Sequence, residues 1–298
     1  MFPPTNRAGK ISICILDPKA FVLCQPDSID AAMHPFVCGR RRDWASLSFG
    51  PAWLIADRVL AADVAQYVRF RAVCTAWRGC TADPSGDALD RRFHPRCWVK
   101  LQDVVTRGKR PRYRYSRFLN MTTHEQIRMT IRGLDGRGGR LRIACTCVGL
   151  LVLVNKRTDG VFVLNPITGA RADLPPLGSL LSSHTRDFVL PRAPGVSSLS
   201  AELTSDSAVV INFGGGGYQR MGIARPGDEH WTKVEYEHRI GGTVLSFAGD
   251  VYCFTAGPSR TPLVLETSPD NPPRLVKSDK HPADFINGFN DVISLMLA

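Results

Sequence analysis

The distribution of apolar and polar residues divides the chain into a short helical part and a long part made of strands. Between residues 43 and 78, apolar residues recur at helical spacing. Four of them follow the i, i+3, i+4, i+7 rule of an amphipathic helix: Phe70, Val73, Cys74 and Trp77. Beyond about Tyr113, short apolar runs alternate with turns rich in Gly, Pro and Asp. The pattern predicts a mainly β protein with a small helical module near its N-terminus.

Two helices are predicted within residues 43–78. Pro51 suits the first turn of one helix, where its missing N–H is not needed. Asp63 is a natural N-cap for the second helix, and Gln66 three residues later completes a variant of the capping box. Two short helices cannot bury their whole apolar stripe between themselves. We therefore expect part of the stripe to meet another surface.

The strand-rich part shows a weak repeat. The motif L-N-x-x-T occurs at residues 119–123 and again, 45 residues later, at 164–168. Turns at 225–228 and 268–270 lie at a similar spacing. Because a four-stranded propeller blade repeats at roughly 40–50 residues, propeller-like blades are favoured over an unrelated β-sandwich. Strands are expected at 150–155, 161–164, 208–213, 243–247, 251–255 and 263–266.

The helical segment resembles the F-box, most specifically in the ending V-C-x-x-W-R at residues 73–78. In that family the segment packs against a Skp-family adaptor, which links it to a cullin-based ubiquitin ligase. The resemblance implies a set of partner-binding residues: Leu47, Pro51, Leu54, Ile55, Val59, Leu60, Val64, Val73, Cys74 and Trp77.

The remainder resembles plant F-box proteins that carry a C-terminal KIB-type β-propeller. Four motifs carry this resemblance: L-D-R-R-F-H-P-R at 89–96, G-L-L-V-L at 149–153, L-N-P-I-T-G at 164–169 and D-L-P-P-L at 173–177. The predicted organisation is a poorly ordered leader at 1–42, an F-box-like module at 43–80, a basic connecting segment at 81–112 and an incomplete, about four-bladed propeller-like domain at 113–298. The expected function is recognition of an unidentified target protein for ubiquitin transfer, without catalysis by this chain.

Charge supplies the first alternative. The net charge is +11, and residues 91–118 contain ten Lys/Arg against one acid, Asp103. Aromatic residues interleave with these charges, as in proteins that combine phosphate contacts with base stacking. Residues 113–118 also alternate with period two, as a strand with one solvated face does. We favour the strand, so nucleic-acid binding through 91–118 is an alternative and not the main prediction.

No catalytic residue, cofactor or metal site is predicted. The set Cys74, Cys80, His94 and Cys97 lacks the close spacing of a zinc knuckle. No G-x-S-x-G nucleophile motif occurs, so a hydrolase on a propeller scaffold is the weaker alternative. Nine irregularly spaced cysteines and the lack of a signal peptide or a membrane-spanning apolar run predict a cytoplasmic or nuclear protein that is not secreted and has no membrane partner.

Overall fold

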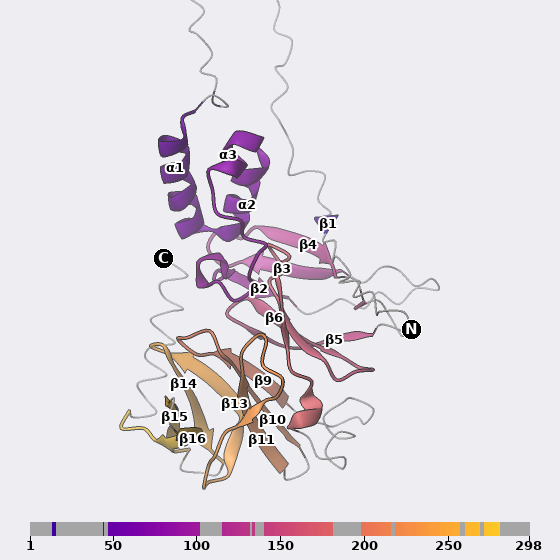
Figure 1. Cartoon of the computed structure of the whole chain (residues 1–298), viewed down its shortest axis with the longest axis vertical. Helices are drawn as coiled ribbons and strands as arrows, with labels where there is room; N and C mark the ends of the chain where they lie inside the picture. Colours follow the sequence, from indigo (N-terminus) through magenta and orange to yellow (C-terminus); the bar gives the residue numbers. More distant parts are fainter. Residues whose placement is uncertain are drawn as a thin grey trace, which may run out of the picture.

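The computed structural model describes residues 14–15, 44, 47–101, 115–131, 133–134, 140–180, 198–215, 218–256, 260–268 and 271–280. Within these residues, a small group of helices leads into four antiparallel sheets of four strands each. Figure 1 shows the helices standing together at one end of the molecule, with α1 running toward the sheets. The structure therefore has the predicted mainly β class with a helical N-terminal module, and its four sheets agree with the expected count of about four blades.

The helical module consists of α1 (Phe49–Ala62), α2 (Val64–Ala72) and α3 (Thr75–Gly79). Asp63 separates α1 from α2 and caps α2 as predicted, because its carboxylate accepts a hydrogen bond from the backbone N–H of Ala65 at 3.0 Å. The same carboxylate accepts hydrogen bonds from Trp98 Nε1 at 2.8 Å and from Asn120 Nδ2 at 3.3 Å. One buried side chain thus joins the helices to the first sheet.

The four sheets follow one another along the chain. Sheet 1 contains β2 (Trp98–Lys100), β3 (Ser116–Asn120), β4 (Gln126–Thr130) and β1 (Cys14–Ile15). Sheet 2 contains β5 (Leu141–Cys147), β6 (Leu150–Asn155), β7 (Val161–Leu164) and β8 (Arg171–Leu174). Sheet 3 contains β9 (Ser198–Leu203), β10 (Val209–Gly215), β11 (Tyr218–Ala224) and β12 (Thr232–Lys233). Sheet 4 contains β13 (Ile240–Phe247), β14 (Asp250–Thr255), β15 (Pro262–Ser268) and β16 (Asn271–Lys277).

The L-N-x-x-T motif that repeats in the sequence forms a turn in sheet 1 and a turn in sheet 2. The asparagine Oδ1 accepts hydrogen bonds from the N–H groups two and three residues later, at 2.9 and 3.0 Å for Asn120 and at 3.0 and 3.2 Å for Asn165. Each turn ends with a residue of positive φ, His124 at 57° and Gly169 at 79°. These turns connect β3 to β4 in sheet 1 and β7 to β8 in sheet 2. The turn predicted at 225–228 lies between β11 and β12 of sheet 3, whereas residues 269–270 of the turn predicted at 268–270 lie outside the described part.

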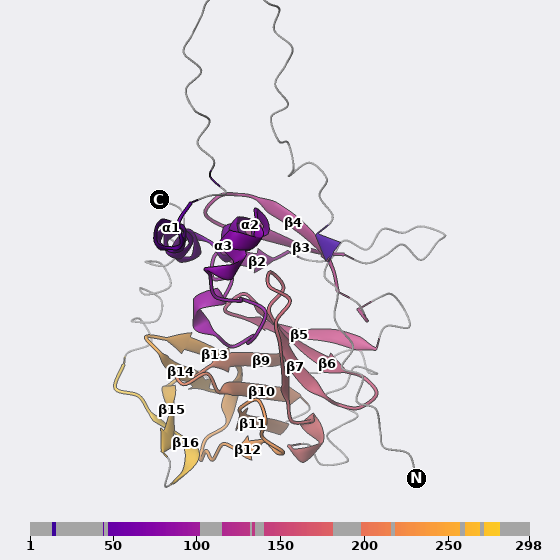
Figure 2. The same cartoon turned by 45° about the horizontal axis from the view of Figure 1, so that its top comes forward.

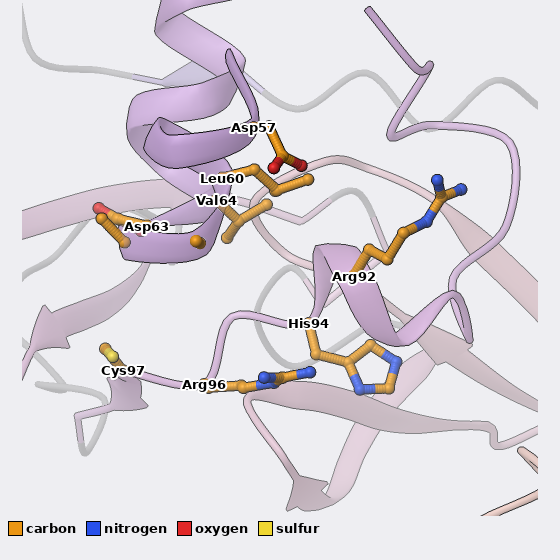
Figure 3. A pocket seen from close by; sticks show the side chains of 10 residues that line it. Asp57, Leu60, Asp63, Val64, Arg92, His94, Arg96 and Cys97 are labelled. Atoms are coloured by element: carbon orange, nitrogen blue, oxygen red, sulfur yellow. The ribbon is translucent and has the colours of Figure 1, made fainter. Parts of the chain in front are cut away.

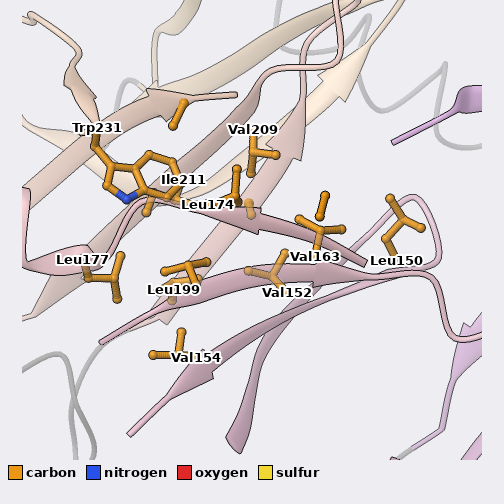
Figure 4. Close-up of a cluster of buried hydrophobic side chains, with 14 of the residues drawn as sticks. Leu150, Val152, Val154, Val163, Leu174, Leu177, Leu199, Val209, Ile211 and Trp231 are labelled. Carbon is orange, nitrogen blue, oxygen red and sulfur yellow. The ribbon is translucent and has the colours of Figure 1, made fainter. Parts of the chain in front are cut away.

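The sheets stack on one another through apolar cores. Figure 4 shows the core between sheets 2 and 3, where Leu150, Val152 and Val154 of β6 face sheet 3. Leu151 and Leu153 of the same strand belong instead to the core shared with sheet 1 and the helices. A third core joins sheets 3 and 4. The first strands also lie beside one another, β5 next to β9 and β9 next to β13 (Figure 2). This is the stacking of propeller blades, and it explains the continuous apolar run of β6.

Two short strands lie outside the part where strands were predicted. β1 falls within the expected leader, yet Cys14 and Ile15 pair with Thr130 and Met129 of β4. β2 falls within the expected connecting segment and pairs with β3. The segment that begins at Ala88 is also buried, so it is part of the folded core and not a solvated connector. The segment contributes four buried apolar residues: Ala88, Leu89, Phe93 and Trp98. They were not predicted to be buried because basic residues lie between them. The remaining domain boundaries stay predictions, and residues 102–114 lie outside the described part.

Candidate partner-binding site

α1 has an inverted arrangement for a helix that covers a core. The residues it buries are alanines, Ala52 and Ala56, whereas Phe49, Trp53 and Leu54 are 70%, 53% and 56% exposed. Leu54 stands two positions from each alanine, which is about 200° around a helix, so its side chain points away from the core. A helix that served only to cover a sheet would place its large apolar residues inward. The outward side chains therefore need another explanation.

Exposed apolar residues concentrate in this part of the molecule. Nine large apolar residues are exposed in the part of the chain that the structure describes, and six of them belong to the helical module or the turn before it. We call these six the exposed apolar set: Trp44, Phe49, Trp53, Leu54, Ile55 and Val73. Figure 1 shows that the module lies at the end of the molecule away from sheets 3 and 4. Clusters of this kind mark sites of protein–protein contact.

The opposite side of the module is fixed to sheet 1. Val64, Tyr67 and Phe70 of α2 share a core with Phe118 and Met129 of the sheet. At the rim, the guanidinium of Arg69 forms an ion pair with the carboxylate of Glu125 in the turn between β3 and β4. The module therefore packs directly against the β domain and is not connected to it by a linker alone.

The V-C-x-x-W-R motif builds the third helix. Cys74 is the N-cap of α3, and its Sγ accepts a hydrogen bond from the backbone N–H of Trp77 at 3.4 Å. The Trp77 ring stacks on Phe70 of α2, with centroids 4.3 Å apart and an interplanar angle of 16°. Arg71 Nη1 donates to the backbone carbonyls of Thr81 and Ala82 at 2.5 and 2.7 Å, just past the end of α3. The spacing of the motif is thus explained by contacts within this chain.

The structure distributes the ten predicted partner-binding residues over three environments. The exposed ones are Pro51, Leu54, Ile55 and Val73. The half-buried ones are Leu47, Val59, Leu60, Cys74 and Trp77. Val64 alone is buried, in the core shared with sheet 1. The prediction omitted Trp44, Phe49 and Trp53, although an aromatic pair at i and i+4 flanking Pro51 was a usable signal.

A pocket of about 260 Å³ lies where the α1–α2 junction meets the segment after the 3₁₀ turn Arg91–Phe93 (Figure 3). Asp57 and Leu60 line one wall, and Arg92 and His94 line the other. Arg92 is already ion-paired with Asp90. Desolvation lowers the pKa of His94 to about 4, so the ring is neutral at physiological pH. The pocket therefore lies where α1 meets the segment around His94, and Arg92 and His94 do not form an acid–base pair in it.

The four residues weighed as a zinc site are not brought together as one. Cys74 and Cys80 flank α3, whereas His94 and Cys97 line the pocket below α1. Among the residues that the structure describes, no group of three or more His, Cys, Asp or Glu side chains could hold a metal ion. The described cysteines Cys74, Cys80, Cys97, Cys145, Cys147 and Cys253 carry free thiols.

The described part of the basic segment 91–118 belongs largely to the fold. Arg91 Nη1 donates to the carbonyl of Ser205 at 3.2 Å, which ties the segment to sheet 3. The alternating strand predicted at 113–118 is present only from Ser116, where β3 begins, and burial alternates from there to Asn120. Ser116 is buried and Tyr115 is 40% exposed, so the polar residue and not the aromatic one faces the core. None of the helices in the described ranges is both long and apolar enough to cross a membrane.

Comparison with known proteins decides the family. A sequence profile of the KIB1-4 beta-propeller family matches residues 118–292, more than half of the chain. The chain belongs to this family. An F-box/kelch-repeat protein of Arabidopsis thaliana is 31% identical over 126 residues, which cover 40% of this KIB-type chain and 30% of the relative, so the match spans less than a third of the relative's length. No solved structure matches. The two matches confirm the resemblance to plant F-box proteins with a KIB-type propeller, and they favour a non-catalytic protein.

Proposed function

We propose that this chain is the substrate-recognition adaptor of an SCF-type ubiquitin ligase. The helical module binds a Skp-family protein and, through it, a cullin, while the β domain binds a target protein in the cytoplasm or nucleus. The observation that carries the proposal is the exposed apolar set, on a module whose helix α2 is already packed against sheet 1. The F-box name of the Arabidopsis thaliana relative supports it.

Large apolar side chains with few internal contacts are suited to anchor a partner. Aromatic anchors that become fully desolvated at an interface typically cost about 2 kcal/mol or more of binding energy when truncated. Phe49, Trp53 and Leu54 are the most exposed large apolar residues of α1 and contribute little to the internal core. Their truncation should therefore weaken binding without unfolding the chain.

The mounting of the module gives the adaptor a fixed geometry. Asp63 bonds to two residues of sheet 1, and the Arg69–Glu125 pair adds a second attachment. A target held by the β domain would keep one orientation relative to the Skp-family protein. Fixed orientation favours transfer reactions, because the reacting groups need not search for each other.

Co-purification with a Skp-family protein tests the proposal. The full chain would be co-expressed with a plant Skp-family protein as wild type, as Leu54→Asp and as Val148→Asp. Val148 is the matched control, because it is 41% exposed and lies in the turn between β5 and β6, outside the helical module. We expect wild type and control to retain the partner and Leu54→Asp to lose at least tenfold of it. Failure of the wild type to bind, or equal recovery of all three, would contradict the proposal.

A further inference from the structure

Sheet 4 is the last of the described sheets along the chain, and it has an inner and an outer face. Its inner face packs on sheet 3 through residues such as Val244, Cys253 and Leu263. The residues that alternate with these point to the outer face, because neighbouring positions of a strand point to opposite faces and cross-strand partners share a face. Four cross-strand partners form an apolar row over the outer face, one from each strand from β13 to β16: Leu245, Tyr252, Val264 and Val276.

The apolar row is shielded from solvent, although it belongs to none of the three apolar cores that join the sheets. Tyr252 is 2% exposed, and Leu245, Val264 and Val276 are half-buried. None of the four is among the nine exposed large apolar residues of the described part, whereas Phe49 on the open side of α1 is 70% exposed. The burial of the row therefore needs a cover other than a neighbouring described sheet.

The chain itself turns onto this outer face after β16. β16 ends at Lys277, and three residues later Lys280 Nζ donates a hydrogen bond to the hydroxyl of Tyr252 at 2.7 Å. The same Nζ lies 5.1 Å from the ring centroid of Phe247 and 4.9 Å from that of Tyr252. The Tyr252 hydroxyl donates in turn to Asp250 Oδ2 at 3.2 Å. Tyr252 belongs to β14, two strands away from β16, so Lys280 directs the chain across the sheet and not away from it.

The sequence that follows Lys280 has the pattern of an amphipathic helix. A helix over residues 285–297 would be about 20 Å long at 1.5 Å per residue. Four strands about 4.8 Å apart span about 14 Å, so such a helix is long enough to cross the apolar row. Five apolar residues follow the spacing i, i+4, i+7, i+8, i+11 of one helix side: Phe285, Phe289, Val292, Ile293 and Met296.

Other occupants of the outer face are at a disadvantage. The leader is held at sheet 1, where Cys14 and Ile15 pair with β4, and Figure 1 shows β1 far from sheet 4. A second copy of a chain with net charge +11 is disfavoured by electrostatic repulsion. The segment after Lys280 starts on the face itself, so its effective concentration there is on the order of millimolar. Residues 281–298 also contain two Asp and no Lys or Arg, unlike the rest of this basic chain.

We propose that residues 281–298 pack across the outer face of sheet 4 in place of a neighbouring blade, and that Lys280 positions them there. The apolar side of the segment covers the row from Leu245 to Val276, and its polar side faces solvent. Terminal units of a stacked array need such a cap, because an uncovered apolar face favours self-association. The proposal concerns the β domain alone and does not depend on the binding of a Skp-family protein.

Photo-cross-linking within the full chain tests the proposal. The photoreactive residue p-benzoylphenylalanine would replace Phe289 in one version of the chain and Asn287 in another. Asn287 is the matched control, because two positions are about 200° around a helix and place it on the polar side. We expect the probe at Phe289 to cross-link to peptides of β13–β16 in the same chain, with about fivefold more product than the probe at Asn287, since cross-linking requires contact. Mass spectrometry of the digested product identifies the cross-linked peptides.

The role of Lys280 is tested in the same assay. Lys280→Ala should lower the cross-linking yield of the Phe289 probe about threefold, because it removes the contacts with both rings. Lys277→Ala is its control and should change the yield less than Lys280→Ala does, since Lys277 is exposed and pairs with Leu263 of the inner face. Equal yields in the two variants would overturn the role of Lys280. Cross-links to another sheet, to the helical module or between two copies, or equal yields from Phe289 and Asn287, would overturn the proposal as a whole.

Discussion

Helix α1 and strand β6 are both rich in apolar residues, yet the fold uses them in opposite ways. In β6, the residues from Leu150 to Val154 are at most 1% exposed, because sheets lie against both faces of the strand. In α1, the fold buries two alanines and leaves Phe49, Trp53 and Leu54 in solvent. The comparison teaches that an apolar run is not by itself evidence of a core. What distinguishes the two runs is whether the chain supplies a covering surface.

The largest effect is expected where the chain covers its own residues. Leu153 lies in β6 of sheet 2 and is fully buried in the core that sheet 2 shares with sheet 1 and the helices. Leu153→Ala removes buried methyl groups and leaves a cavity, so we expect it to lower the free energy of unfolding by about 3 kcal/mol. Chemical denaturation followed by circular dichroism measures this. Leu54→Ala serves as the comparison. A similar loss of unfolding free energy in that variant would show that the Leu54 side chain is buried, contrary to the structure.

The joint between the two regions should give the next largest effect. Asp63→Ala removes the cap of α2 and leaves Trp98 Nε1 and Asn120 Nδ2 without their acceptor. The loss should be about 2 kcal/mol of unfolding free energy. We also expect faster amide hydrogen exchange in α1 and α2 with little change in β6. Uniform acceleration over both regions would mean that the module and the propeller do not separate at this joint.

The free energy of unfolding should depend on pH through the contact between sheets 2 and 3. Burial raises the pKa of Glu202 on β9 to about 7, and Cys147 Sγ of β5 donates to its Oε2 at 3.5 Å. Cys145 of β5 is another titratable group close to it, because burial and, to a smaller extent, the carboxyl of Glu202 raise the pKa of the Cys145 thiol. A carboxyl whose folded pKa exceeds its unfolded value favours the folded state below the unfolded pKa, and this contribution is lost as pH rises through the folded pKa.

We therefore expect the wild type to lose on the order of 1–2 kcal/mol of stability between about pH 5 and pH 8 through this group. Glu202→Gln should flatten that part of the profile. The measurement is a series of denaturant titrations across this pH range. If stability changed equally with pH in the wild type and in Glu202→Gln, Glu202 would not be the cause of the pH dependence.

The smallest effect is expected on the exposed side of the comparison. Leu54→Ala should change the unfolding free energy by less than about 0.5 kcal/mol, because substitutions of solvent-exposed residues without internal contacts seldom do more. The same substitution should weaken binding of a Skp-family protein by about tenfold. Thermal denaturation and a pull-down on one preparation give both values. If Leu54→Ala were destabilised and bound the Skp-family protein unchanged, Leu54 of α1 would belong to the core and not to the partner-binding surface.

Local signals in the sequence predicted much of the fold. The bounds of β6 and β7 agree with their predicted ranges, because apolar runs and turn residues mark both ends. The L-N-x-x-T repeat predicted equivalent turns, since the asparagine side chain forms the turn itself. β1 and β2 escaped prediction because strands of two and three residues carry no period of their own and depend on pairing with distant segments.

The candidate site was predicted less completely, for a physical reason. Helical periodicity identifies an apolar stripe but not which half of it the chain covers. Val64 lies on the covered side, and Leu54 lies on the open side. The V-C-x-x-W-R motif lies in the same helical module as the exposed apolar residues, although Cys74 and Trp77 mainly build α3. Which large residues face solvent became visible only from the packing of α1 and α2 on sheet 1.

Hydrogen–deuterium exchange on the full chain with and without a Skp-family protein tests the central claim most directly. We predict that the partner slows exchange in α1 and in the α2–α3 corner around Val73, by at least tenfold for the first turns of α1, and leaves β6 unchanged. Protection in β6 or the other sheets without protection in residues 49–73 would contradict the account, as would no change anywhere at saturating partner.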